Sequence, residues 1–117
     1  MSEEIRGGEF TETDLRFAAT RQRDEAEEHL RRVPLARTEI LTAISVEVDR
    51  AKMHGEKFAS LHEAYAVILE ELDEVWDITR QKRCNRSAVD LRKELIQLGA
   101  MAVKSLESLD RFVGGTV

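Results

Sequence analysis

Apolar residues recur every three or four positions along most of the chain, which is the spacing of one face of an α-helix. The pattern predicts helices over about residues 11–33, 37–54, 60–83 and 88–112. The third predicted helix is the most regular, and its expected core stripe is Leu61, Ala64, Tyr65, Ile68, Leu72, Val75 and Thr79, widened by Leu69 and Trp76. With one Pro and six Gly in 117 residues, turn signals are too few for many short strands. The predicted fold class is therefore all-α.

Capping residues indicate where these helices begin and end. Thr11 and Asp14 form a capping-box pattern before the first helix, and Ser60 and Glu63 form another before the third. Pro34 stops the first helix, because the residue before a proline is driven out of the helical region. The first helix carries few apolar residues, so we expect it to lie at the periphery or against a partner subunit.

The predicted connections between the second, third and fourth helices are short, so these helices should be antiparallel neighbours. We expect a flexible N-terminus over residues 1–10, an accessory helix over 11–33 and a helical core over 37–113. Three such helices and one weakly apolar helix leave a wide face uncovered. The sequence predicts an antiparallel bundle of about four helices, completed by homo-oligomerisation as a homodimer or a larger assembly. The alternative is a small monomeric bundle.

Charge and composition exclude several classes of partner. Eighteen Lys and Arg against 23 Asp and Glu give a net charge of −5, which disfavours binding to a nucleic-acid backbone. No apolar run approaches the roughly 20 residues of a membrane span, and the acidic start lacks the apolar region of a signal peptide. The single Cys84 fits a free thiol in a reducing compartment. We therefore expect a cytoplasmic protein with no nucleic-acid or membrane partner.

Three glutamates fall where apolar residues are expected. On a helical wheel Glu71 lies inside the apolar arc of the third helix and Glu74 lies at its edge, whereas Glu70 points to the polar side. Glu94 lies inside the apolar arc of the fourth helix, with Gln97 at the edge. An ionised carboxylate in such a position loses hydration, so it must be paired or bind a metal ion.

Antiparallel packing of the third and fourth helices would bring Glu71, Glu74 and Glu94 together. Carboxylate oxygens suit Mg²⁺, which keeps its remaining coordination positions for water or substrate phosphate oxygens. A water activated by the metal ion and a nearby carboxylate could attack a phosphorus atom. The alternative is that these acids pair with Lys and Arg of neighbouring helices, as acids of charged helices commonly do.

The acidic pattern resembles that of a known family. Residues 68–75, with the sequence ILEELDEV, and residues 91–97, with the sequence LRKELIQ, resemble the all-α nucleotide pyrophosphohydrolases of the MazG-like superfamily. The signature of that superfamily is E-x-x-E on one helix and E-x-x-D on the next. Glu71 to Glu74 matches the first pair, and Glu94 follows after 20 residues, which suits the family's helix–loop–helix. The resemblance covers about residues 37–113, where residues 49–55 also look like the first-helix ending of small, phage-type members.

This resemblance implies a chemistry and a set of site residues. The implied reaction is hydrolysis of a nucleoside triphosphate, or a related phosphoanhydride, to a monophosphate and pyrophosphate, with Mg²⁺ or Mn²⁺ as cofactor. The implied catalytic residues are Glu71 and Glu74, and the implied metal ligands are Glu71, Glu74, Glu94 and Gln97. Basic residues near the motif that would contact substrate phosphates are Lys52, His54, Lys57 and Arg80. The alternative for His54 is an ordinary residue at a helix C-terminus, where the helix dipole favours it.

Gln97 departs from the family pattern, because it stands where the family has its second-pair Asp. A neutral amide is a weaker metal ligand than a carboxylate, so two other functions stay open. The first is a nucleotide-binding or sequestering protein that uses the same scaffold without hydrolysis. The second is a helical interaction module whose acids are merely paired. Trp76 and Tyr65 are expected to be core or interface residues.

Overall fold

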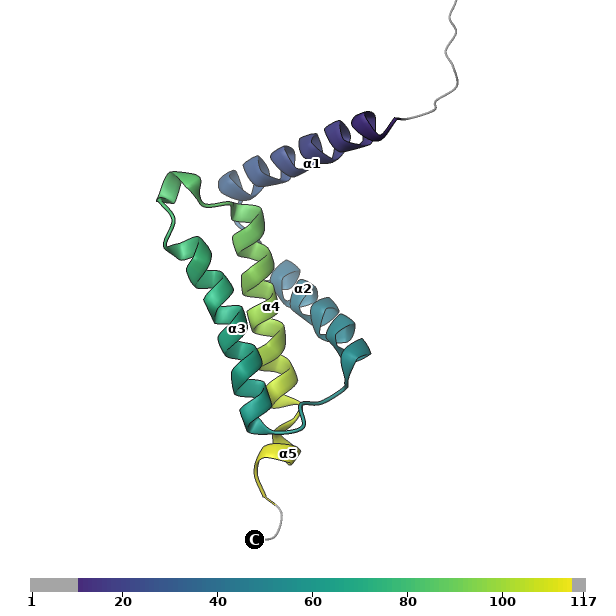
Figure 1. Cartoon of the computed structure of the whole chain (residues 1–117), viewed down its shortest axis with the longest axis vertical. Coiled ribbons are helices and arrows are strands. Elements are labelled where there is room, and N and C mark those ends of the chain that lie inside the picture. The colour runs from purple at the N-terminus through teal and green to yellow at the C-terminus, as the bar shows by residue number, and fades with distance from the viewer. Residues whose placement is uncertain (1–10, 115–117) are drawn as a thin grey trace, which may run out of the picture.

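The computed structural model describes residues 11–114, and over this range the chain forms helices and no strand (Figure 1). The helices are α1 (Glu12–Arg32), α2 (Arg37–Ala51), α3 (Leu61–Thr79), α4 (Ala88–Leu106) and α5 (Leu109–Phe112), with short 3-10 turns η1 (Lys52–His54) and η2 (Arg83–Asn85). The predicted all-α class is confirmed. The segment expected to be flexible, residues 1–10, lies outside the described residues.

The predicted capping side chains hold the starts of α1 and α3. The hydroxyl of Thr11 accepts a hydrogen bond from the backbone N–H of Asp14, and the Asp14 carboxylate accepts one from the Thr11 N–H, both at 3.1 Å. The hydroxyl of Ser60 accepts from the Glu63 N–H at 3.1 Å. The Glu63 carboxylate turns to the N–H of Ala59, at 2.8 Å, instead of completing a capping box with Ser60. Each helix start thus satisfies backbone donors that would otherwise lack partners.

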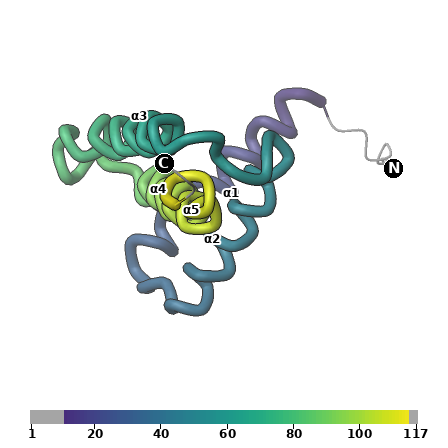
Figure 2. The backbone as a smooth tube through the Cα atoms, turned by 90° about the horizontal axis from the view of Figure 1, so that it is seen from below, coloured from purple at the N-terminus to yellow at the C-terminus, as the bar shows by residue number. Residues whose placement is uncertain are grey.

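α4 lies at the centre of the molecule, between α3 and α2. α3 runs antiparallel beside α4, and α2 packs against a different side of α4 (Figures 1 and 2). At Gly99 of α4 the two helices approach so closely that an added Cβ atom would lie 3.0 Å from the Cδ1 atom of Ile44 on α2. Glycine at this position therefore permits the close packing of α2 on α4.

α3 presents a narrower buried face than the sequence predicts. Ala64 and Ile78 are buried, and Val75 is half-buried. The members of the predicted stripe and its widened side that remain exposed are Leu61, Tyr65, Leu69, Leu72, Trp76 and Thr79. The predicted stripe is wide enough for two neighbours, whereas α3 packs mainly against α4 alone. The side of the apolar stripe that does not face α4 is consequently exposed in the single chain.

The end of α3 differs from the prediction, which extended the helix to Arg83. The helix ends at Thr79, and the guanidinium group of Arg86 folds back on the chain just beyond this end. Arg86 donates to the backbone carbonyl of Thr79 at 2.6 Å and to that of Gln81 at 3.2 Å. These bonds satisfy carbonyls that a continuing helix would have used.

The fourth predicted helix is also interrupted, since α4 ends at Leu106 and α5 forms separately. Ser108, which is fully buried, lies in the break. Its hydroxyl donates to the backbone carbonyl of Lys104 at 2.7 Å and accepts from the backbone N–H of Phe58 at 3.1 Å. This pair of bonds ties the loop before α3 to the end of α4.

α1 crosses the N-terminal end of α4 and extends beyond the other helices (Figure 1). It ends at Arg32, as expected from Pro34, and none of its residues is buried against the part of the chain that the structure describes. Arg23 forms an ion pair with Asp90 of α4 at 2.8 Å. Its contacts with the rest of the described chain are mainly with α4.

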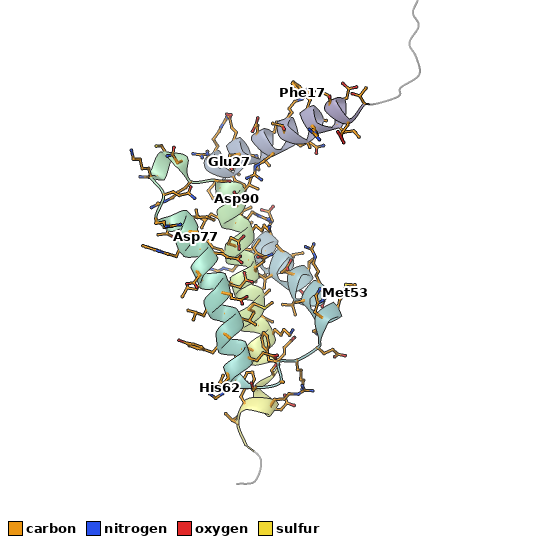
Figure 3. The ribbon with its side chains drawn as sticks, viewed as in Figure 1. Phe17, Glu27, Met53, His62, Asp77 and Asp90 are labelled. Carbon is orange, nitrogen blue, oxygen red and sulfur yellow. The ribbon has the colours of Figure 1, made fainter. Side chains whose placement is uncertain are left out.

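Glu27 of α1 caps the N-terminus of α4, where Glu27 and Asp90 mark the junction in Figure 3. Its carboxylate accepts hydrogen bonds from the backbone N–H groups of Ala88 and Val89, at 2.6 and 3.1 Å, and from the hydroxyl of Ser87 at 2.7 Å. Burial by itself would raise the pKa of Glu27, but these hydrogen bonds outweigh it and lower the pKa to about 2. The ionised carboxylate therefore fastens α1 to α4.

Within residues 11–114, none of the helices combines the length and the apolar character that crossing a bilayer requires.

Candidate metal centre

The acids predicted to meet lie together between α3 and α4. Glu71 and Glu74 of α3 and Glu94 of α4 each present a carboxylate oxygen, and these oxygens all lie within 4.8 Å of one another. We call these three residues the acidic cluster. Ligand oxygens around one Mg²⁺ lie about 3–4 Å apart, because each Mg–O distance is about 2.1 Å. Small side-chain rotations would therefore bring all three carboxylates onto one cation.

Helix geometry explains why these side chains converge. Glu71 and Glu74 are three residues apart on α3, so they project from neighbouring positions of one helix face. The antiparallel run of α4 places Glu94 opposite them. Glu71 and Glu94 are half-buried and Glu74 is exposed, so the acidic cluster opens to solvent on one side. An ion and a substrate could reach it from that side.

Gln97, the fourth predicted ligand, also lies at the acidic cluster. With its side-chain nitrogen turned toward the carboxylates, Gln97 donates to the Oε2 atom of Glu71 and to the Oε2 atom of Glu94, both at 3.2 Å. The amide therefore offsets part of the repulsion between the acids. Binding a cation through Gln97 would require the amide to turn by about 180°, so that its oxygen faces inward.

The closeness of the carboxylates shifts the pKa of Glu94. A hydrogen bond shared with Glu74, followed by burial and by the negative charge of Glu74, raises the pKa of Glu94 to about 7. Near neutral pH, Glu94 is therefore protonated in a large fraction of molecules when no cation is bound. A cation entering the acidic cluster would displace that proton.

The pKa of Glu71 is raised as well. Burial is the main cause, and the negative charges of Glu74, Glu70 and Glu47 add to it. Lys93 opposes the shift only in part. The electrostatic environment at this end of the α3–α4 interface thus favours an added positive charge.

Glu47 of α2 is a member of this acidic environment that the sequence analysis missed. Its side chain is only 19% exposed, and its carboxylate lies 3.5 Å from the guanidinium group of Arg50. A signal was present in the sequence, because Glu47 lies three residues after Ile44 and four before Ala51, inside the apolar stripe of its helix. Glu47 is thus recognisable on a helical wheel in the same way as Glu71.

The four basic residues expected near the substrate do not gather at one place. Lys57 precedes α3 and Arg80 follows it, so they lie at opposite ends of a 19-residue helix. Ion pairs engage three of them: Lys52 with Glu107 at 3.7 Å, Lys57 with Asp110 at 2.8 Å, and Arg80 with Asp77 at 3.4 Å. His54 and Lys57 line one groove at the end of the molecule where α3 begins.

Comparison of the chain with models of protein families, with curated proteins and with solved structures finds no match. The resemblance to MazG-like pyrophosphohydrolases therefore remains a hypothesis that rests on the residues of the acidic cluster and their spacing.

Proposed function

We propose that this chain is a Mg²⁺-dependent hydrolase of nucleoside triphosphates, or of related phosphoanhydrides, that releases a nucleoside monophosphate and pyrophosphate in the cytoplasm. The observation that supports this proposal most strongly is the convergence of Glu71, Glu74 and Glu94, whose carboxylate oxygens lie within 4.8 Å of one another. Three carboxylates in such proximity form a donor set suited to a hard divalent cation.

The donor set also fits the chemistry of phosphoanhydride hydrolysis. Mg²⁺ or Mn²⁺ at this position would polarise phosphate oxygens and lower the pKa of a bound water. Glu71, Glu74 and Glu94 would hold the cation, and Gln97 would turn its oxygen toward the cation or orient a water. Because the cluster is open on the side of Glu74, we propose that this carboxylate accepts a proton from the attacking water.

The proposed reaction balances without any further reactant. The oxygen of a water molecule forms a bond to the α-phosphorus, and the bond from that phosphorus to the oxygen bridging to the β-phosphorus breaks. Pyrophosphate leaves with the electron pair of the broken bond, and the proton from water passes through a carboxylate to solvent.

Gln97 favours one alternative, which is nucleotide binding without hydrolysis. In the arrangement described above the amide donates to both Glu71 and Glu94 and so stabilises the acidic cluster without a cation. A site of this kind could retain a nucleotide while lacking the fourth carboxylate that its metal chemistry would use. A helical interaction module, whose acids have no ligand, is the third possibility.

We further propose that the active form is a homo-oligomer. The exposed apolar stripe of α3, defined as Leu61, Tyr65, Leu69, Leu72 and Trp76, follows one helix face through 16 residues. The exposed fractions of these residues range from 43% to 66%. A contiguous apolar surface of this kind typically marks an interaction site. A second copy of the chain would cover it and supply the neighbour that α3 lacks.

The experiment that tests the proposed activity is a thermal-shift screen against nucleotides, with and without Mg²⁺, combined with a pyrophosphate assay. We expect stabilisation and Mg²⁺-dependent pyrophosphate release with at least one nucleotide. Stabilisation without release would favour the binding protein, and no shift with any nucleotide would favour the interaction module.

A matched pair of variants assigns the result to the acidic cluster. Glu71→Gln should abolish turnover and weaken Mg²⁺ binding by about tenfold or more, because the count of charged ligands sets the affinity of such sites. Glu70→Gln, at an exposed neighbouring position, should retain both properties. Equal effects of the two substitutions would contradict the assignment.

A further inference from the structure

The opposite end of the α3–α4 pair holds a buried lysine without a counter-ion. Lys104 of α4 is 7% exposed, although lysine is almost never buried unless it is paired. Its ammonium group lies 4.6 Å from the centre of the Phe58 ring. Within residues 11–114 it has no carboxylate partner within 4.0 Å, and none of its N–H groups makes a hydrogen bond.

Lys104 lines a groove with a volume of about 400 Å³. The groove lies between the end of α2, the loop before α3 and the last turns of α4, near His62 at the foot of the view in Figure 3. His54 and Lys57 add basic groups to its wall, and Phe58, Val67 and Met101 add apolar surface. The groove therefore combines a mostly buried lysine side chain with room for a small molecule.

One acid, Glu63, forms part of the groove wall, and a second, Asp110, pairs with Lys57 of the wall. Glu63 accepts a hydrogen bond from the backbone N–H of Ala59 at 2.8 Å. Asp110 accepts both of the hydrogen bonds that Lys57 donates, at 2.8 and 2.9 Å. Neither carboxylate lies within 4.0 Å of the Lys104 ammonium group, so no carboxylate of the described residues pairs with this charge.

We propose that this groove is a second binding site, separate from the acidic cluster, which takes an oxyanion such as a phosphate or carboxylate group of a small molecule. The buried Lys104 would supply the main charge and hydrogen-bond donors, and His54 and Lys57 would add positive potential at the rim. The ring of Phe58 faces one side of the ammonium group and leaves other N–H groups for the anion. This site does not depend on hydrolysis at the acidic cluster.

The test is thermal unfolding of the full chain in increasing inorganic phosphate, and separately in malonate, at constant ionic strength set with NaCl. EDTA keeps the acidic cluster free of cations. Either anion alone, or both, should raise the unfolding temperature, and the anion that does so identifies the source of the oxyanion. An equal temperature in phosphate, malonate and NaCl would overturn the proposal.

Two lysine substitutions in α4 test whether the anion-dependent rise in unfolding temperature comes from Lys104. Lys104→Met should lose the anion-dependent rise, yet unfold at the same or a higher temperature without anion, because it removes an unpaired buried charge. Lys93→Met, at an exposed position of α4, should keep the rise. A full anion-dependent rise in Lys104→Met would contradict the site.

If Lys104→Met fails to fold, amide chemical shifts of the unmodified chain decide the question. Phosphate or malonate should then shift the amide signals of Phe58, Ala59 and Met101 in a saturable way. Shifts spread over the whole chain, or none at these amides, would overturn the proposal.

Discussion

Gln97 is the residue on which the chemistry of the acidic cluster depends most. With its nitrogen turned toward the carboxylates, its amide donates to both Glu71 and Glu94. This interaction explains how half-buried acids of like charge remain adjacent. It also opposes metal binding, because the nitrogen must turn away before the side-chain oxygen can act as a ligand.

Replacing Gln97 by Asp should therefore strengthen metal binding. We expect Gln97→Asp to bind Mg²⁺ about tenfold or more tightly, because it adds a fourth carboxylate. Without metal the same variant should be less stable than the unmodified chain, since it removes two hydrogen bonds and adds like charge. Isothermal titration and urea unfolding in EDTA measure the two effects.

Gln22→Asp on α1 makes the same change of charge at an exposed position and should alter neither property. Weaker Mg²⁺ binding by Gln97→Asp would contradict a cation site at these residues.

Glu94 gives the acidic cluster a pH dependence of defined sign. Its pKa is raised to about 7 in the folded chain, from an ordinary value of 4.5, so folding favours the protonated form. The stability that this proton provides is complete below about pH 4.5 and is lost as the pH rises through about 7. In EDTA, the free energy of unfolding should therefore fall between about pH 5 and 8.

Glu94→Gln should remove most of this fall, because the amide does not titrate. Mg²⁺ affinity of the unmodified chain should rise over the same pH range, since the cation competes with the proton. An identical pH dependence of unfolding in the variant and the unmodified chain would show that Glu94 does not control it.

Helix boundaries set by residues close in sequence were predicted well, whereas those involving tertiary hydrogen bonds were not. The starts of α1 and α3 were predicted because Thr11 and Ser60 act on backbone groups within their own first turns. The break between α4 and α5 depends on Ser108 bonding Phe58, 50 residues away, which helical periodicity does not encode. The role of Glu27 at the start of α4 was missed for the same reason.

The residues of the acidic cluster could be predicted because they follow from periodicity. A glutamate inside an apolar arc must face a neighbouring helix, and the short connection made α4 the neighbour of α3. Which residues of the α3 stripe stay exposed could not be predicted in this way, because periodicity does not say how many helices pack against the stripe.

Glu27 should determine how firmly α1 is attached to α4. Glu27→Ala leaves the N–H groups of Ala88 and Val89 without their acceptor, so we expect a loss of about 1–2 kcal/mol, as for other helix caps. Faster amide hydrogen exchange along α1 and the first turn of α4 should accompany it. Glu28→Ala, which removes an exposed ion pair with Arg32, is the matched control.

Acid should detach α1 in a similar way. The pKa of Glu27 is lowered to about 2 in the folded chain, so its contribution to stability is present above about pH 4.5 and is lost as the pH falls toward 2.

Exchange rates in α1 that are unaffected by Glu27→Ala would mean that other contacts hold this helix.

Among the described residues, many large apolar side chains are exposed to solvent. Of these residues, the buried apolar side chains are only Val48, Phe58, Ala64, Ile78 and Ala100. The five residues of the exposed apolar stripe of α3 are each between 43% and 66% exposed. A second copy that covers the stripe would bring the total buried surface closer to that of an ordinary domain.

Self-association through α3 predicts a dimer or a larger assembly in solution. Trp76→Glu places a charge at the C-terminal end of the expected interface and should shift the mass measured by light scattering to that of one chain. Met53→Glu, at an apolar residue that is 82% exposed on η1, should leave the mass unchanged. A single-chain mass for the unmodified protein at all concentrations would contradict the interface.

Glu71, Glu74 and Glu94 are proposed to support cleavage between the α- and β-phosphates, and phosphorus NMR of nucleoside triphosphates identifies the products of that cleavage. With Mg²⁺ and the unmodified chain, we expect signals of a nucleoside monophosphate and of pyrophosphate. Both signals should be absent in EDTA or with Glu71→Gln. A nucleoside diphosphate with orthophosphate, or unchanged triphosphate for every nucleotide, would contradict the claim.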